Sequence, residues 1–423
     1  MNKNNFLVFC ITMTLVFFLS GCFALKKPQK INISFSSWGS QSEISTLEPI
    51  LKEFEKQNPD IKIKFIHIPK NYFQKLHLLI ASNLTPDVVF INNINGKVYI
   101  KNSIFENLNP YIENDKDISE KDFFDKSLKA FEDKNSLYAI PRDISNIVIY
   151  YNKDIFDKYK VPYPNKNWTF DDFLKTAKSL TKDLNNDRKP DIFGVSFEEN
   201  PLFWLPFLWS NGGGLISEDL KKVIITEPQS KKALIFYSNL RNKWHVAPFA
   251  EEQGSATMAQ MFIQGRIAMH ISGRWSTPAY RKLPDLNWDI VAFPKGKIGS
   301  VVDADASGWA ISKTSKNKKA AWKLIKFLAS KKESEKFTKD GLIVPARKDV
   351  AYSDIFLNKK EKPFNSRVFV DIIPASIPTP SNENYQEMID LVSQNFEPFF
   401  RGNTSFDSIL NKNFEQKILK LLK

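Results

Sequence analysis

The side chains best suited to bind a small molecule stand where predicted strands end. Trp38 and Asn92 fall at the carboxyl ends of two such strands, and Glu43 follows in the loop or first helical turn after Trp38. In open α/β sheets, ligands bind outside the carboxyl ends of strands. An aromatic ring can stack on an apolar ring face, while carboxylates and amides exchange hydrogen bonds with hydroxyl groups. Together these residue types suit a small molecule that has both an apolar face and polar groups.

Cys22 has a different chemistry. It ends the segment Leu19-Ser20-Gly21-Cys22, which follows an uncharged apolar run from Phe6 to Leu19 with Lys3 ahead of it. At about 1.5 Å per residue, that run is too short to cross a hydrocarbon core of roughly 30 Å. Residues 1–21 are therefore predicted to be a signal peptide.

The four residues ending at Cys22 resemble a bacterial lipobox, which implies cleavage after Gly21 and lipid on the Cys22 thiol. Residues 22–30 would then be a short tether at the extracytoplasmic face of the cell membrane. Ordinary signal cleavage beside a chance cysteine is the alternative. Cys10 lies inside the signal, so the mature chain would keep one cysteine and form no internal disulfide.

Signatures of catalysis and of metal binding are weak. The four histidines have no metal-ligand spacing, and neither a Ser-His-Asp set nor a nucleophile elbow is visible. The segment 183–194 is similar to a calcium loop. However, Arg188 stands where the tight turn needs glycine, and Gly194 stands where a bidentate glutamate belongs. We expect a surface turn there, with no metal and no cofactor in the protein.

The net charge of +13 does not indicate nucleic-acid binding. Most of the basic residues are lysines, scattered among Asp and Glu without the compact Lys/Arg cluster that tracks phosphates. A lysine-covered, solvated surface is expected instead.

The elements that must position these residues alternate between strand and helix. In a first set, predicted strands cover 33–38, 61–65 and 87–91, and helices cover 44–54 and 72–81. In a second set, strands cover 147–151, 267–271 and 289–293, with helices near 170–182 and 229–242 and a further amphipathic helix at 315–330. This order favours doubly wound α/β units, and the length allows two or three of them.

Ten segments, in order, resemble one family, the family 1 extracellular solute-binding proteins that serve as sugar-binding lipoproteins of ABC importers. Each is weak alone, and the last 70 residues have no clear match. The segments are 33–39 (ISFSSWG), 54–63 (FEKQNPDIKI), 86–90 (PDVVF), 137–141 (LYAIP), 150–156 (YYNKDIF), 168–173 (WTFDDF), 210–213 (SNGG), 262–269 (FIQGRIAM), 315–322 (SKNKKAAW) and 344–350 (VPARKDV).

The resemblance implies a type II periplasmic-binding-protein fold, in which two doubly wound α/β lobes are joined by hinge crossovers. By analogy, one lobe takes residues 31–141 plus 294–330, and the other takes 142–293 plus 331–423. The ligand would lie between the lobes, and its binding would close the cleft.

Positions carried over from the family give a candidate ligand site. Gln74 and Asn92 stand where some relatives have charged residues, so the ligand of this chain is expected to differ from theirs. Asp143 falls at the hinge and cleft floor, although it could instead cap a turn. The full set is Trp38, Glu43, Gln74, Asn92, Asp143, Trp275, Gly308, Trp309 and Arg347.

Not every tryptophan fits a site. Trp168 and Trp322 sit in helical apolar patterns and are predicted to pack in cores. Trp204 and Trp209 could belong to a core or to the cleft wall.

The sequence thus predicts a monomeric, non-enzymatic receptor that passes a carbohydrate to the permease subunits of an ABC transporter. One alternative is an anionic ligand such as a glycerophosphodiester, held by Arg142, Arg274 and Arg347. A second is a surface carbohydrate-active enzyme with Asp143 and Glu43 as acid and base. A surface adhesin is the remotest alternative.

Overall fold

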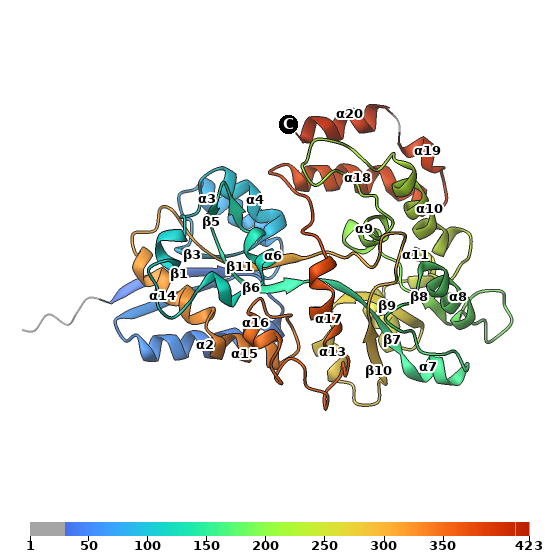
Figure 1. Ribbon diagram of the computed structural model, residues 1–423, viewed down its shortest axis with the longest axis horizontal. Helices are drawn as coiled ribbons and strands as arrows, with labels where there is room; N and C mark the ends of the chain where they lie inside the picture. Colours follow the sequence, from blue (N-terminus) through green and yellow to red (C-terminus); the bar gives the residue numbers. More distant parts are fainter. Residues whose placement is uncertain (1–29, 411, 423) are drawn as a thin grey trace, which may run out of the picture.

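The computed structural model describes residues 30–410 and 412–422. Cys22, the predicted signal peptide and all of the tether except Lys30 lie outside them. Two lobes stand next to each other, joined by a narrow middle (Figure 1). Within the described ranges, no helix has the length and apolar character that a membrane crossing requires.

The sheet of the first lobe has the strand order β2-β1-β3-β11-β6. Its parallel half consists of β2 (Ile61–His67), β1 (Ile31–Ser37) and β3 (Val88–Asn92). The last strand in sequence, β11 (Asp305–Ile311), enters the sheet antiparallel between β3 and β6 (Ile140–Ser145). Residues Val88 to Ile91 are fully buried, as expected for a strand covered on both faces.

Helices cover both faces of this sheet, with α2 and α15 on one side and α3 and α4 on the other (Figure 1). The helix α2 begins with a capping box in which Ser40 and Glu43 bond each other's backbone N–H groups. The helical segments of this lobe are α2 (Gln41–Gln57), α3 (Tyr72–Ala81), α4 (Asn93–Lys101), α5 (Asn109–Ile112), η1 (Glu120–Asp122), α6 (Asp125–Lys129), α14 (Lys318–Leu328), α15 (Lys331–Lys339) and α16 (Lys348–Ala351), with a small β4 (Glu132–Asp133) to β5 (Ser136–Leu137) hairpin.

The second lobe is built on the sheet β10-β7-β9-β8. Its strands are β10 (Trp288–Val291), β7 (Ile147–Asn152), β9 (Ile267–Gly273) and β8 (Phe193–Val195), and only the β8–β9 pair is parallel. Its helical segments are α7 (Lys153–Lys158), α8 (Phe170–Leu180), α9 (Pro201–Ser210), α10 (Pro228–Asn242), α11 (Ala250–Gln253), α12 (Met258–Ile263), η2 (Arg274–Ser276), α13 (Thr277–Arg281), α17 (Val368–Asp371), η3 (Ile373–Ala375), α18 (Tyr385–Phe400), α19 (Phe406–Ile409) and α20 (Lys412–Leu421).

These sheets and helices confirm the predicted two-lobed α/β fold, and every predicted strand and helix is present. Trp168 and Trp322 are buried as predicted, and Trp204 and Trp209 belong to the core of the second lobe. The last 70 residues, which match no family segment, complete that core, because Phe396, Phe400 and others from α18 to α20 pack into it.

The packing of α15 differs from the division into lobes by analogy. Residues 331–423 were expected in the second lobe, but α15 lies against α2 of the first lobe, where Lys332 and Lys336 both bond Glu53. Phe337 accordingly belongs to the core of the first lobe. The apolar side of α15 packs on the core of the first lobe. The chain therefore returns to the second lobe only after α15.

Three chain segments meet between the lobes and are bonded to one another. The link between β6 and β7 and residues 302–305 each cross from one lobe to the other, and residues 376–379 run beside them from η3 to α18 of the second lobe. Ile377 exchanges backbone hydrogen bonds with Val302 and Ala304, at 2.9 and 2.7 Å. Buried Asp305 accepts hydrogen bonds from Asn93 Nδ2 (2.8 Å) and from the backbone and hydroxyl of Thr379. The three segments therefore form one connected hinge.

A second buried acid in the hinge, Asp303, is only half satisfied. Its Oδ1 accepts the N–H of Ile147 at 3.0 Å. Its Oδ2 and the Oδ1 of Asn146 are both buried without a hydrogen-bond partner among the described residues. Burial raises the pKa of Asp303 well above its ordinary value, and the neighbouring Asp305 adds to the rise.

We predict that Asp303→Asn stabilises the protein at about pH 8, by about 1–3 kcal/mol. A raised carboxyl pKa favours folding below the unfolded-state pKa, and that contribution is lost as pH rises through the folded-state value. The substituted amide would keep the acceptor for Ile147 without the charge, so the advantage of the variant should shrink towards about pH 4. Urea unfolding at several pH values measures it. Exposed Asp354→Asn is the control, and an equal gain there would contradict the prediction.

Candidate ligand-binding cleft

A cavity of about 180 Å³ lies where the lobes meet and takes its walls from both of them. The first lobe contributes the end of β1, the start of α2, and parts of β6 and β11. The second lobe contributes η2, directly after β9. The side chains that matter chemically are Trp38, Glu43, Arg142, Asp143, Arg274 and Trp275.

Trp38 is half-buried at the end of β1 and is held by other rings. Its ring centroid lies 4.2 Å from that of Phe90, with Phe73 at 5.4 Å and Tyr72 edge-on at 5.1 Å. Since these contacts fix the indole, its remaining surface can face a ligand without a further loss of side-chain freedom.

Glu43, Arg142 and Asp143 form a charged wall. Arg142 lies between the two acids and donates from Nε to Asp143 Oδ2 at 2.7 Å and from Nη1 to Glu43 Oε1 at 3.3 Å. Its guanidinium also stacks 4.4 Å above the Phe90 ring. The remaining oxygens are used locally, because Asp143 Oδ1 accepts the N–H of Ser307 and Glu43 Oε2 that of Ser40.

Burial and the neighbouring charges shift the pKa values of Arg142 and Asp143 in opposite directions. Burial alone would lower the pKa of Arg142, but the carboxylates of Asp143 and Glu43 outweigh it, so the pKa is raised and the guanidinium stays charged. Burial raises the pKa of Asp143, and Arg142 opposes that rise. The wall offers a ligand both donors and acceptors in fixed positions.

Trp275 enters the cavity from the second lobe and is 40% exposed, unusually open for a tryptophan. Its ring folds back over Gly273. A Cβ built on Gly273 would meet the Trp275 ring carbons at 2.0 and 2.4 Å. The glycine is therefore what allows the indole to lie flat along the end of β9 and present a face to the cleft.

The glycine and tryptophan predicted on β11 belong to the body of the first lobe. A Cβ on Gly308 would lie 2.5 Å from the Ile140 carbonyl oxygen, so Gly308 lets β11 and β6 approach at a bulge. Trp309 is 2% exposed and packs near Phe90 and Phe337. Trp309 supports the floor beneath the cavity and does not line it.

Three other predicted residues also lie outside this cavity. Asn92 caps α4, its Oδ1 accepting the N–H of Asn95 at 2.7 Å. Gln74 is exposed on α3 and lines a separate groove of about 400 Å³ next to α18. Arg347 donates two 3.0 Å bonds to Asp349 and lies 3.5 Å from Asp122. Arg347 thus braces the first lobe.

The Arg274 side chain lines the cavity, but its guanidinium is bonded to protein groups. It donates to the Gly341 carbonyl at 3.0 Å and to Ser366 Oγ at 2.9 Å, and it stacks 4.6 Å from the Phe356 ring. Burial lowers the pKa of Arg274 to about 9. All three arginines suggested for an anionic ligand therefore already have protein partners.

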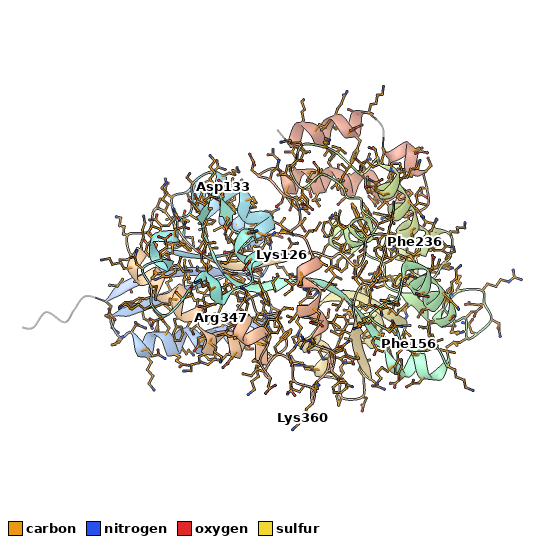
Figure 2. All side chains as sticks on the ribbon, in the orientation of Figure 1. Lys126, Asp133, Phe156, Phe236, Arg347 and Lys360 are labelled. Carbon is orange, nitrogen blue, oxygen red and sulfur yellow. The ribbon has the colours of Figure 1, made fainter. Side chains whose placement is uncertain are left out.

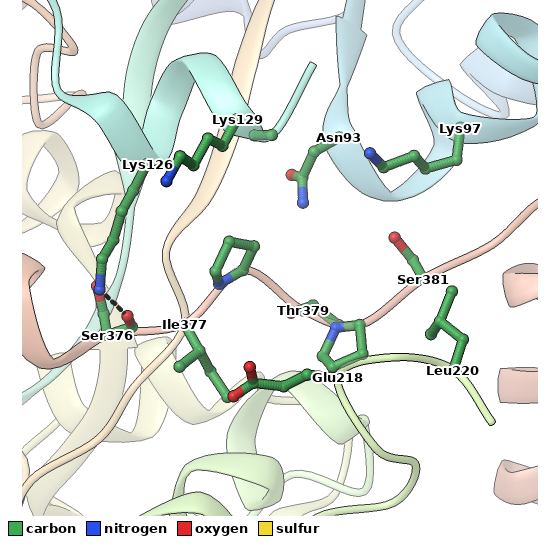
Figure 3. Close-up of a pocket in the computed structure, with 13 residues that line it drawn as sticks. Asn93, Lys97, Lys126, Lys129, Glu218, Leu220, Ser376, Ile377, Thr379 and Ser381 are labelled. Carbon is green, nitrogen blue, oxygen red and sulfur yellow. Dashed lines mark hydrogen bonds between the residues drawn. The ribbon is translucent and has the colours of Figure 1, made fainter. Parts of the chain in front are cut away.

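A larger cavity, of about 490 Å³, also spans the lobes, and no predicted site residue lines it (Figure 3). It lies between α4, α6, the 218–220 loop of the second lobe and the 376–381 segment, which joins η3 to α18. Its volume is in the range of roughly 300–1,000 Å³ that ligand sites occupy. The slight sequence signal for this cavity is the pair of prolines in that segment, Pro378 and Pro380.

No group of three or more His, Cys, Asp or Glu side chains arranged to hold a metal ion occurs in the described part of the chain. In the 183–194 loop, the carboxylates bond the loop's own backbone. Asp183 accepts the N–H groups of Asn186 and Arg188, and Asp191 accepts that of Leu184.

Known proteins share this architecture. The galactooligosaccharide-binding protein of Bacillus subtilis is 24% identical over 362 residues, which are 83% of this chain and 80% of that protein. An ABC substrate-binding protein from Listeria monocytogenes, solved in complex with cycloalternan, is 28% identical, with a TM-score of 0.84 over 92% of this chain and 98% of that one. A solute-binding protein from Thermotoga lettingae, solved with α-D-tagatose, has a TM-score of 0.78 at 22% identity, covering 93% of this chain and all of that one.

The family model for bacterial extracellular solute-binding proteins matches residues 38–335, well over half of the chain. Relatives and structural neighbours named as sugar-binding proteins agree with that match. The chain belongs to the bacterial extracellular solute-binding protein family, the exported family that includes the sugar-binding components of ABC importers.

Proposed function

We propose that this protein is a lipid-anchored, monomeric receptor on the extracytoplasmic face of the cell membrane. It binds a carbohydrate between its lobes and delivers it to the permease subunits of an ABC transporter. One observation carries the ligand class: Trp38 of the first lobe and Trp275 of the second lobe line the same cavity, together with the Glu43–Arg142–Asp143 wall. Stacking surfaces combined with fixed donors and acceptors suit a sugar.

The division of the site between lobes supports a receptor that closes on its ligand. A sugar held by both tryptophans favours the closed arrangement over the open one, and the segments that cross between the lobes must bend as the lobes close. The closed lobes together would then present one surface to the permease.

We assign no reaction to the site. Glu43 and Asp143 both contact the Arg142 guanidinium. A glycosidase needs one carboxyl group free to protonate the leaving oxygen and another able to attack or to activate water. Hydrolysis of a sugar panel that either Glu43→Gln or Asp143→Asn abolishes would overturn this assignment.

Intrinsic tryptophan fluorescence, titrated with neutral mono- and oligosaccharides, tests the ligand class. We expect a saturable change for at least one sugar, because Trp38 and Trp275 would pass from solvent contact to a sugar face. Silence across the panel would remove the carbohydrate proposal while leaving the fold intact.

The anchor is tested separately with Cys22→Ser. The variant is expected to leave the membrane fraction and bind sugar as the wild type does, while uptake by cells falls. A tethered receptor searches a thin layer beside its permease, and a released one is diluted. A variant that stays in the membrane fraction would contradict the lipid anchor.

A further inference from the structure

The 490 Å³ cavity differs from the tryptophan cleft in its charge. Its lining includes Lys97 on α4 and Lys126 and Lys129 on α6, and the acidic side chain among the lining residues is Glu218 of the second lobe. Figure 3 shows the Lys97 side chain reaching towards Asn93, and the two α6 lysines on the neighbouring wall. Lys129 and Glu218 are exposed to solvent, whereas Lys97 and Lys126 are partly buried.

The lysines of this cavity are not neutralised. None of the three forms an ion pair within residues 30–410 and 412–422. Lys97 Nζ has the Glu132 carbonyl at 3.4 Å, a long contact. Lys126 Nζ donates to the carbonyls of Pro374 (2.8 Å) and Ser376, which ties α6 to the end of η3 in the second lobe. Lys97 and Lys129 are therefore the pair that can reach a ligand.

The electrostatics of the cavity agree with this geometry. Burial lowers the pKa of Lys97, although Asp133 opposes the shift. Burial also lowers the pKa of Lys126, with Glu218 opposing the shift and Lys129 adding to it. Positive charge is thus under-compensated in this cavity, and an entering anion would relieve it.

Apart from the Glu218 carboxylate, which accepts, and the Ser381 hydroxyl, which can donate or accept, the side-chain groups of this cavity that remain for a ligand are lysine donors. The amide of Asn93 is used by Asp305 and by the N–H of Ala306, and the hydroxyl of Thr379 bonds Asp305. A neutral sugar hydroxyl needs an acceptor as well as a donor, whereas a carboxylate, phosphate or sulfate needs donors only. The tryptophan cleft, by contrast, has two carboxylates.

We propose that this cavity binds an anionic group carried by the saccharide, so that the preferred ligand is an acidic saccharide bearing a carboxylate, phosphate or sulfate. The inference rests on the proposed carbohydrate-binding function and narrows its ligand class. Both cavities border the carboxyl edge of the first sheet, where Ser307 of the cleft pairs with Asn92, the residue before Asn93. For one oligosaccharide to occupy both cavities, its neutral rings would lie at the tryptophans and its acidic group at the lysines.

The test is calorimetric titration of the full chain with three probes. These are neutral gluco- and galacto-trisaccharides, the same trisaccharides with a terminal uronic acid, and inorganic phosphate. We expect an acidic trisaccharide to bind about tenfold more tightly than its neutral counterpart, as one charge-assisted contact would give. The double variant Lys97→Gln/Lys129→Gln should lose that preference and keep the neutral affinity, which also shows that it is folded.

Lys359→Gln/Lys360→Gln is the matched control, because both lysines are exposed and Lys360 lies at the lower edge of the molecule, away from the centrally placed Lys126 (Figure 2). It removes the same two charges and should leave the preference intact. Equal affinity for neutral and acidic trisaccharides, or a preference that survives the double variant, would overturn the proposal. So would phosphate binding as tightly as the acidic saccharide. Failure of every saccharide to bind would instead remove the carbohydrate function itself.

Discussion

Trp275→Ala is expected to weaken sugar binding by about 30-fold, the effect of losing roughly 2 kcal/mol at an aromatic hot spot. The indole is the largest apolar face that the second lobe presents to the cleft. Because it is 40% exposed, its loss should change the free energy of unfolding little, by about 0.5 kcal/mol. Calorimetric titration and urea unfolding on the same preparation separate the two effects.

Two further variants locate the effect at the cleft face of the ring. Gly273→Ala keeps the tryptophan but puts a methyl group where the ring lies, so binding should weaken although the indole remains. Trp244→Ala removes a half-buried tryptophan that packs on Phe236 in the same lobe, outside the cavity, and affinity should persist. Wild-type affinity in Trp275→Ala would contradict the stacking role.

Arg142→Met is expected to destabilise the fold by about 3–5 kcal/mol, because it leaves buried carboxylates without their cation. Asp143 is 6% exposed and would lose its 2.7 Å partner, and Glu43 would lose the same guanidinium. Urea unfolding gives the magnitude. Arg142→Met/Asp143→Asn should recover part of the loss, since one uncompensated charge is then absent.

The pH dependence of the Arg142→Met deficit follows from Asp143. Burial raises the pKa of that carboxyl, so in the variant it binds a proton more readily folded than unfolded. The penalty applies above the folded-state pKa and fades as pH falls through it, so the deficit should shrink in acid.

Arg367→Met, which removes an exposed arginine paired with Asp371, should cost at most about 1 kcal/mol. If Arg142→Met and Arg367→Met lowered the free energy of unfolding equally, burial of the Arg142 ion pairs would not explain the loss.

Much of the fold was accessible from sequence because its signals are local. The apolar run at 88–91, the alternation at 61–65 and the helical spacing at 44–54 each depend only on neighbouring residues, and each element formed as expected. Lobe membership is not local. Whether α15 packs on the first or the second lobe depends on which core its apolar side meets, and no short pattern encodes that.

The candidate site shows the same limit more sharply. Trp275 and Trp309 occur in similar short contexts, yet one is 40% exposed in the cleft and the other is 2% exposed. The difference is that Trp309 lies within a strand, facing the core of the first lobe, whereas Trp275 lies just beyond one. The basic cavity was harder still, since its lysines come from α4 and α6, and their shared environment arises only from folding.

The position of β11 has a consequence for how the chain is made. This strand lies between β3 and β6, yet its residues begin at Asp305. Until the ribosome has passed that point, the first sheet has a gap in its middle and two unpaired edges. At roughly 5–20 residues per second, the nascent chain spends many seconds unable to finish even its first lobe. For an exported protein this delay is useful, since a chain that cannot yet lock its fold can still be threaded through a membrane.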